Sequence, residues 1–322
     1  MRKIELLIPA VSLSALLIAS SFSNKTENYP YSYNSTPKAY TMFLDEDLPN
    51  AFEEYLTETL NTSKMVPQGL SISDDYIFVS MYDYSHINNS FIQVYDKEGS
   101  LVNVCSLRNK AHVGGISYDK ERNLLWVSSY LGNVDAYGIF DIIHKDEAKP
   151  RYKDLYLGQG LRSYNNPFET AVSYLTMHNN SLYVGNFTLG RNGIVKQYEI
   201  DVDEERTIHL KEVNRFKVPN LVQGISFYEK DDNTYMILSR SRGIRVPSTL
   251  QIFKYDEGIS DYTNPLINYR SFEFPPMIEQ IATDKDSIYS LYESQSEPYR
   301  NDNNTENTLN KTNIKRLLAN FN

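Results

Sequence analysis

Short apolar runs, each only about five residues long and separated by polar turns, dominate the chain after Val66. Apolar and polar positions alternate within these runs, which is typical of half-buried β-strands. The runs come in pairs: a first run containing small and polar residues, then a more apolar second run. The first runs are Val66–Ile72, His112–Tyr118, Ala171–Leu175, Leu221–Phe227 and Ile278–Ala282, and the second runs are 76–80, 124–128, 181–185, 235–239 and 287–291.

These pairs recur at intervals of about 45 to 60 residues, the spacing of the four-stranded blades of a β-propeller. Third strands are predicted at 90–95, 193–198 and 249–255. One such sheet cannot bury both of its faces alone, whereas radial packing of several sheets buries them all. We therefore predict an all-β fold: a β-propeller of five blades with about four strands each.

The sequence leaves two features of this propeller undecided: the number of blades and the strands that complete the last one. A sixth blade would require an additional unit between Leu131 and Asn166, where no first-strand pattern occurs. The fifth unit lacks strands after Leu291, and we expect Ala39–Leu44 and Ile314–Phe321 to complete it, with Glu297–Thr312 as a long loop between.

The residues before Val66 have a different pattern. One helix is predicted over Asp45–Leu60, with Asp47 as a cap and Pro49 in its first turn. Residues 1–23 form a basic start, an apolar run and a small-residue end, the pattern of a signal peptide, with a retained membrane anchor as the alternative. The expected organisation is a signal peptide (1–23), a leader and helix that pack on the propeller (24–65), and the propeller itself (66–322).

Composition narrows the set of partners. The net charge of −9 argues against nucleic acid, and 26 tyrosines suit strand faces and polar or sugar-like ligands. Cys105 is the only cysteine, so the fold has no internal disulfide, and a buried, unreactive side chain is expected for it. With the signal peptide, this composition predicts a secreted or cell-surface protein that contacts a membrane only if the signal is retained as an anchor.

Polar side chains recur near the start of the first strands, which line the central channel of a propeller. These positions hold Gln68, His112, Thr170, Gln223 and Gln280, and glycines beside them would let the backbones crowd near the axis. Two explanations stay open. The side chains either bind a ligand or ion at the channel mouth, or fill a narrow channel by hydrogen bonding to water and to each other.

A second group of polar residues follows the second strands and should gather on one face of the ring. Its members are Asp83, Asn186, Arg240 and Glu293. Arg240 and Glu293 would form an ion pair, or hold a polar ligand together with His112. Asp83, Asn186 and Glu293 also carry the oxygen ligands that a divalent cation prefers.

The segments Val66–Ile72, His112–Ile116, Val222–Phe227 and Leu238–Gly243 resemble a group of exported bacterial five-bladed propellers, mostly of unassigned activity. More distantly they resemble gluconolactonase-like and virginiamycin-lyase-like propellers. The distant resemblance implies a divalent metal held near the channel by Glu, Asp and Asn. This chain instead carries Gln and His at the predicted axial positions, without a set of axial carboxylates, and this departs from that chemistry.

The sequence thus predicts an exported propeller that binds a small polar molecule, a glycan or a surface protein at the channel mouth. The alternative is a metal-assisted hydrolase or lyase, and a purely structural module is the third reading. The sequence does not decide whether the protein is an enzyme, and it specifies no metal or other cofactor.

Overall fold

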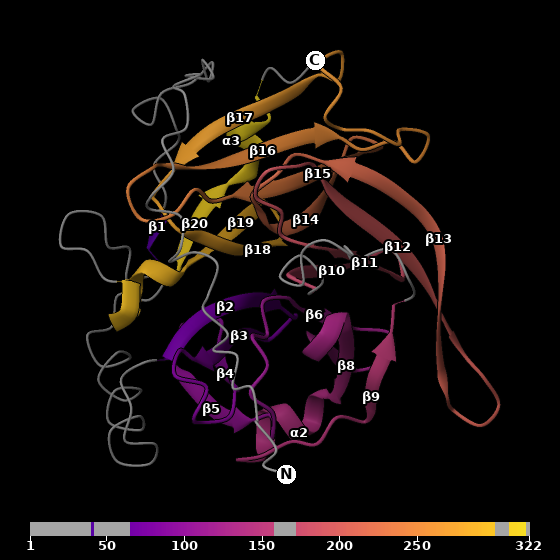
Figure 1. Ribbon diagram of the computed structural model, residues 1–322, viewed down its shortest axis with the longest axis vertical. Helices are drawn as coiled ribbons and strands as arrows, with labels where there is room; N and C mark the ends of the chain where they lie inside the picture. The colour runs from indigo at the N-terminus through magenta and orange to yellow at the C-terminus, as the bar shows by residue number, and fades with distance from the viewer. Residues whose placement is uncertain (1–39, 42–64, 158–171, 300–308, 320–322) are drawn as a thin grey trace, which may run out of the picture.

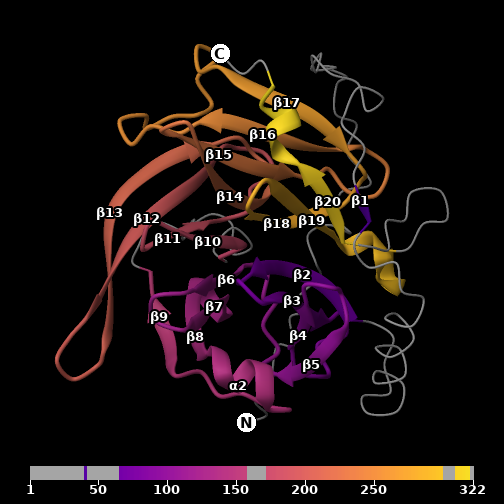
Figure 2. The same cartoon turned by 180° about the vertical axis from the view of Figure 1, so that it is seen from behind.

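The computed structural model describes residues 40–41, 65–157, 172–299 and 309–319. These residues form five antiparallel sheets of four strands each, set radially around a central axis (Figures 1 and 2). The five-bladed propeller predicted from the sequence is confirmed. The region from Leu131 onward contributes to the second sheet, so the described residues contain no sixth blade.

We number the blades 1 to 5 in chain order. Blade 1 contains β2 (Met65–Ile72), β3 (Tyr76–Asp83), β4 (Phe91–Asp96) and β5 (Leu101–Ser106). Blade 2 contains β6 (Ile116–Asp119), β7 (Leu124–Ser128), β8 (Asn133–Gly138) and β9 (Tyr152–Tyr156), with η3 (Tyr130–Gly132) and α2 (Ile139–His144) in its connections. Blade 3 contains β10 (Tyr174–His178), β11 (Ser181–Gly185), β12 (Gly193–Val202) and β13 (Ile208–Val218).

The last two blades follow the same order, except for the closing strand. Blade 4 contains β14 (Val222–Lys230), β15 (Asn233–Arg240), β16 (Ser248–Lys254) and β17 (Tyr269–Phe274). Blade 5 contains β18 (Ile278–Asp284), β19 (Ser287–Tyr292), β20 (Asn310–Asn313) and β1 (Tyr40–Thr41), accompanied by η5 (Glu293–Gln295), η6 (Glu297–Tyr299) and α3 (Ile314–Leu317).

Each blade buries both of its faces against its two neighbours. In β7, Leu125 and Val127 belong to an apolar cluster shared with blade 1, while Leu124 and Trp126 belong to a cluster shared with blade 3. Similar clusters lie between blades 3 and 4, 4 and 5, and 5 and 1. Alternate residues of a strand point to opposite faces, so a continuous apolar run supplies two interfaces at once.

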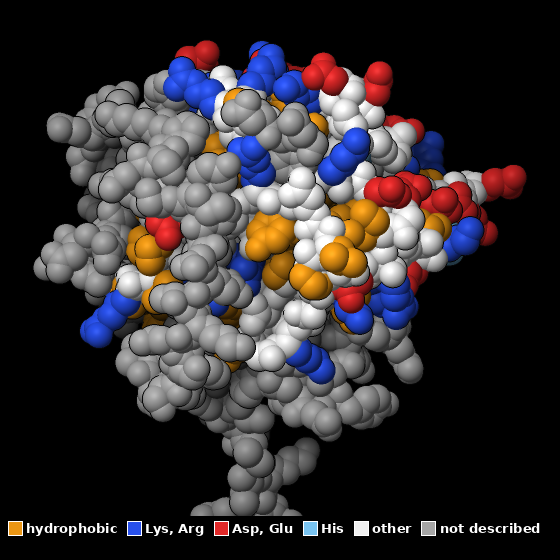
Figure 3. Space-filling view, turned by 90° about the horizontal axis from the view of Figure 1, so that it is seen from above, with side chains coloured by type: hydrophobic (Ala, Val, Ile, Leu, Met, Phe, Trp, Pro, Cys, Tyr) orange, Lys and Arg blue, Asp and Glu red, His pale blue; other side chains and the backbone are white. Residues whose placement is uncertain are grey.

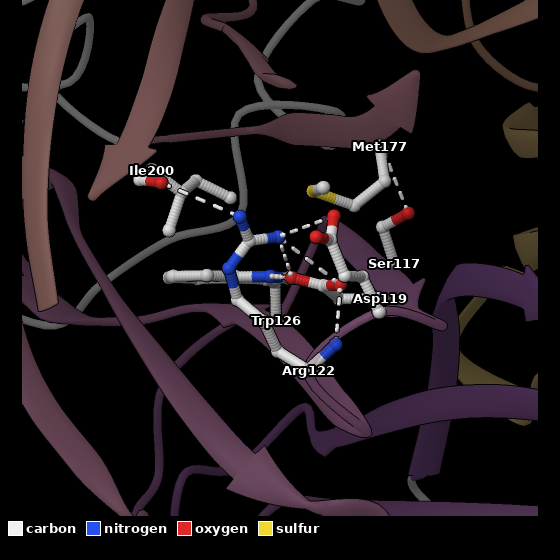
Figure 4. A network of polar contacts seen from close by, with 7 residues as sticks. Ser117, Asp119, Arg122, Trp126, Met177 and Ile200 are labelled. Carbon is white, nitrogen blue, oxygen red and sulfur yellow. Dashed lines mark hydrogen bonds and ion pairs between the residues drawn. The ribbon is translucent and has the colours of Figure 1, made fainter. Parts of the chain in front are cut away.

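A buried polar network reinforces the contact between blades 2 and 3 (Figure 4). The Asp119 carboxylate accepts hydrogen bonds from Trp126 Nε1 (3.1 Å) and from the guanidinium of Arg122 (3.1 Å). Arg122 Nη2 also donates to the carbonyl oxygen of Ile200 in β12, at 3.3 Å. The nearly buried charge of Asp119 is therefore paired, and the pair also joins two blades.

Blade 5 is closed by an early strand of the chain. Tyr40 and Thr41, two residues of the expected segment Ala39–Leu44, pair with Lys311 and Asn310 of β20. The expectation for the tail was wrong. Residues Ile314–Leu317 form α3, whose first turn is capped by the Asn313 side chain, and the strand lies just before it, at the end of the expected loop. Ile314 and Leu317 are buried against blades 4 and 5, so tertiary packing of an apolar turn outweighs its strand-like pattern.

The other predictions for the ends of the chain lie outside the described residues. These are the signal peptide at 1–23 and the helix at 45–60. Among the residues that the structure describes, no helix has the length and apolar character needed to cross a membrane.

The hairpin of β12 and β13 extends well beyond the other blades in Figure 1. Glu204 and Glu205 are exposed at its tip, and acidic side chains also reach the right-hand edge of Figure 3, the side on which Figure 1 shows this hairpin. The hairpin thus projects away from the axis and carries acidic, solvent-facing side chains at its tip.

Glycines allow the first strands to approach each other near the axis. A Cβ atom on Gly115 would lie 2.6 Å from the backbone nitrogen of Leu175, and one on Gly224 would lie 2.8 Å from the Cα atom of Gln280. Both contacts are too short for any side chain. The expectation that glycines permit this crowding is confirmed.

Candidate functional site

A β-bulge interrupts the first strand of three blades and directs polar side chains to the axis. The strand pairing shifts between Pro67 and Gly69 in blade 1, between Val222 and Gly224 in blade 4, and between Ile278 and Ile281 in blade 5. Bulges re-aim side chains at functional positions and at strand ends. The bulged residues are Gln68, Gln223, Glu279 and Gln280.

Four of the side chains around the mouth of the channel form one hydrogen-bonded chain. Gln68 Nε2 donates to Glu293 Oε2 at 3.1 Å, and Gln223 Nε2 donates to Glu279 Oε1 at 2.9 Å. The carboxyl groups of Glu279 and Glu293 are hydrogen-bonded to each other. We call Glu279 and Glu293 the carboxyl pair. The chain links blades 1, 5 and 4 across the mouth.

The carboxyl pair holds a proton near neutral pH. Both residues are 3% exposed, and in the described part of the chain neither carboxyl has a lysine or arginine partner. Burial raises the pKa of Glu293 to about 7, and burial together with the charge of Glu293 raises the pKa of Glu279 well above its usual value. Because two adjacent buried carboxylates would repel each other, Glu279 keeps its proton and donates it to Glu293.

An aromatic cluster lies beside this pair. The ring of Tyr82 stacks on His86 (centroids 5.6 Å apart) and lies 4.3 Å from the ring of His112. The hydroxyl groups of Tyr82 and Tyr299 are 3.4 Å apart. Burial, the neighbouring Tyr299 and the charge of Glu293 all raise the pKa of Tyr82, so the cluster is close enough to sense the carboxyl pair.

His112 is the member of the cluster that faces solvent. His112 is exposed, and its ring packs on Tyr82. The loss of hydration where the ring is packed, together with the nearby His86, lowers the pKa of His112 below its usual 6.5. At neutral pH the imidazole is therefore uncharged and can both donate and accept a hydrogen bond.

Gln280 closes the channel one residue deeper than Glu279. Its Oε1 accepts from the backbone nitrogens of Leu70 (3.2 Å) and Ile116 (2.9 Å). Its Nε2 donates to the carbonyl oxygens of Ile116 (2.7 Å) and Leu175 (2.8 Å). These four bonds use all the hydrogen-bonding capacity of an amide, so Gln280 joins blades 1, 2, 3 and 5 and retains none for a ligand.

The predicted loop residues have local partners. The Asp83 carboxylate accepts from the backbone nitrogens of Ser85, Ile87 and Asn88 and so shapes its own loop. Asn186 Oδ1 accepts weakly from the backbone nitrogen of Ile194, at 3.5 Å. Among the described residues, no three His, Cys, Asp or Glu side chains are grouped so that they could hold a metal ion.

Arg240 binds at a different place from Glu293. Its guanidinium donates to Asn220 O and Asn220 Oδ1, each at 2.8 Å, and lines a hollow of about 60 Å³ together with Arg242 and Glu273. The contacts of Glu293 go to Gln68 and Glu279 instead. The structure thus brings together Gln68, Gln223 and Glu293, with His112 in the adjoining cluster, whereas Asp83, Asn186 and Arg240 have other roles. Thr170 lies outside the described residues.

Glu279 was not predicted as a site residue, and the expectation that the axis lacks carboxyl groups was wrong. Ser80, Ser239 and Ser290 pair with Gly69, Gly224 and Ile281, directly after the bulge in each first strand. Aligned on these serines, Gln280 takes the place of Gln68 and Gln223, as the sequence predicted. The repeat therefore gave no signal for Glu279, which lies one residue earlier.

Comparisons with known proteins add little to this geometry. No family model matches the chain, and no curated protein is significantly similar to it. Among solved structures, the chain is similar to a structural genomics protein of unknown function from Bacteroides thetaiotaomicron, with 12% identity and a TM-score of 0.39. The similarity covers 75% of this chain and only 57% of that protein. The function therefore has to be argued from the site itself.

Proposed function

We propose that the protein is an exported propeller that binds a small polar ligand at the mouth of its central channel. The observation that carries this proposal is the carboxyl pair, which is held by Gln68 and Gln223 beside the solvent-exposed ring of His112. Convergent polar groups at the open end of a rigid scaffold are the usual setting of a binding site.

The alternative explanation is a channel that is merely filled by side chains. It accounts for Gln280 but not for the carboxyl groups of Glu279 and Glu293. Gln280 already ties the first strands together with four backbone hydrogen bonds. The carboxyl pair joins blades 1, 4 and 5 through single side-chain hydrogen bonds, and two adjacent buried carboxyl groups cost free energy unless paired. Costly polar groups of this kind are concentrated at functional sites.

The test is a ligand screen by thermal shift, followed by NMR titration of the histidine signals. A ligand of the mouth should shift the His112 imidazole resonances, and His112→Gln should weaken its binding about tenfold or more. His144→Gln is the matched control, because His144 is exposed on α2 and packs on Phe140 outside the site. Equal loss of binding in both variants, or no response at His112, would contradict the proposal.

Export is a separate part of the proposal, and it rests on the signal-like pattern of residues 1–23. Fractionation of the native host with N-terminal sequencing of the isolated protein tests it. A mature N-terminus shortly after Ser23 supports export, and an intact Met1 in the cytoplasmic fraction contradicts it.

A further inference from the structure

We infer that the ligand of the channel mouth is an organic cation, bound through a protonated amine by the carboxyl pair and the amide oxygens of Gln68 and Gln223. This inference rests on the proposed function and specifies the chemical class of its ligand. Three properties of the site support it: its charge, its hydrogen-bonding groups and its aromatic surroundings.

The first property is a buried acidic pair without a counter-ion. Neither Glu279 nor Glu293 has a lysine or arginine partner among the described residues, and both are almost fully buried. A buried charge is stable only when it is paired and hydrogen-bonded. A ligand ammonium group would provide the missing charge, whereas an anionic ligand would be repelled.

The second property is an excess of hydrogen-bond acceptors. Both glutamines turn their Nε2 groups toward the carboxyl pair, so that each Oε1 is left for another partner. Neither oxygen accepts a hydrogen bond from the described residues, although Gln68 is only 2% exposed. Together with the carboxylate oxygens, these acceptors match an ammonium group, which has three donors and no acceptor.

The third property is the set of aromatic rings next to the pair. Tyr82 is close enough to Glu293 to be affected by its charge, and Tyr299, His86 and His112 surround Tyr82. Burial and neighbouring groups keep Tyr82 and His112 in their neutral forms near pH 7. Neutral aromatic faces attract cations, and enclosure strengthens the attraction. Among the described residues, no lysine or arginine side chain is part of this cluster.

Isothermal titration calorimetry with isosteric ligand pairs tests this inference. The probes are putrescine against 1,4-butanediol and glucosamine against glucose, which differ chiefly in the amino group. At least one amine should bind ten times more tightly than its neutral partner, and Glu293→Gln should remove that preference. Glu229→Gln, an exposed position on β14, is the matched control and should retain the preference.

Proton release provides a second readout. An ammonium group favours the singly charged form of the carboxyl pair, so binding near pH 6.5 should release part of a proton, measurable as a dependence of the heat on buffer ionisation. The release should disappear in Glu293→Gln, because Glu293 is the group that loses its proton near pH 7. Circular dichroism of Glu293→Gln shows whether this variant still folds, so a loss of binding in the folded variant is interpretable.

The outcomes separate the two proposals. If the neutral partners bind as tightly as the amines and binding depends on His112, the channel-mouth site stands and the cationic ligand is refuted. If neither class binds and the His112 signals do not move, both proposals fail.

Discussion

The side-chain amide of Gln280 in blade 5 donates to the backbone carbonyl of Leu175 in blade 3, across the axis of the ring, at 2.8 Å. The same amide nitrogen donates to Ile116 in blade 2, and the amide oxygen accepts from blades 1 and 2. A single side chain therefore links four of the five blades at the point where their first strands converge.

Replacing Gln280 by methionine, which is similar in shape, should destabilise the protein by about 3 kcal/mol or more, because backbone groups near the axis lose their partners. Urea unfolding followed by circular dichroism measures the change. Gln93→Met is the control, since Gln93 is also buried but its Nε2 has no hydrogen-bond partner among the described residues. A similar loss of stability in both variants would show that the change in side-chain volume, and not the loss of the Gln280 hydrogen bonds, causes the destabilisation.

The carboxyl pair predicts that stability falls as pH rises. Folding raises the pKa of Glu293 to about 7 and also raises that of Glu279 well above its usual value, so above the unfolded value near 4.5 the folded state binds more protons. Stability is then fully present below pH 4.5 and decreases by an amount on the order of 3 kcal/mol as Glu293 loses its proton. Urea unfolding at pH 6.5, 7.5 and 8.5 measures the decrease.

This pH range is chosen because His112 and His178 act in the opposite direction below it. Folding lowers both of their pKa values, so they favour the folded state as pH rises toward 6.5. Glu293→Gln should flatten the dependence above pH 6.5, because burial of the Glu293 carboxyl causes its raised pKa. An equally steep curve in that variant would mean that Glu293 is not the group that loses its proton.

Asp119→Asn should lower the free energy of unfolding by about 2–4 kcal/mol, because it leaves the largely buried Arg122 at the junction of blades 2 and 3 without its carboxylate. Trp126 is the only tryptophan of the chain and donates to Asp119, so its fluorescence reports the change directly. We expect a red-shifted emission and a lower unfolding midpoint. Asp74→Asn, which removes an exposed ion pair with Lys120, should leave both nearly unchanged.

A disulfide across the closing strands should stabilise the ring. Thr41 and Asn310 are directly paired in β1 and β20, so cysteines at both positions are close enough to bond. The cross-link would close a very long loop and should raise the free energy of unfolding of the oxidised protein by about 2–5 kcal/mol. Thermal unfolding with and without reductant measures the gain, and failure of the disulfide to form would contradict this strand pairing.

The fold could be predicted because its signals are local and repeated. A first strand and a more apolar second strand recur, and the double-sided burial of residues such as Leu125 and Trp126 follows from a continuous apolar run. The structure near the end of the chain was harder to predict, because the apolar residues Ile314 and Leu317 suit a buried strand and a buried helix turn equally well. Only their packing against blades 4 and 5 selects the helix.

The site was predicted in part. Repetition indicated Gln68 and Gln223 correctly as residues of the mouth, but a bulge of two residues in blade 5 exchanged the roles of Glu279 and Gln280. The partner of each loop residue was not predictable, because Asp83 and Arg240 bind backbone groups that the sequence does not mark. The repeat spacing therefore predicts which residues lie around the axis, but it does not predict which of these residues contact each other.

Gln280 fastens the ring at its centre, while the pairing of β1 with β20 fastens it at its rim. A ring held at both radii cannot release one blade without disturbing the others. The five blades should therefore lose their structure together, as one unit.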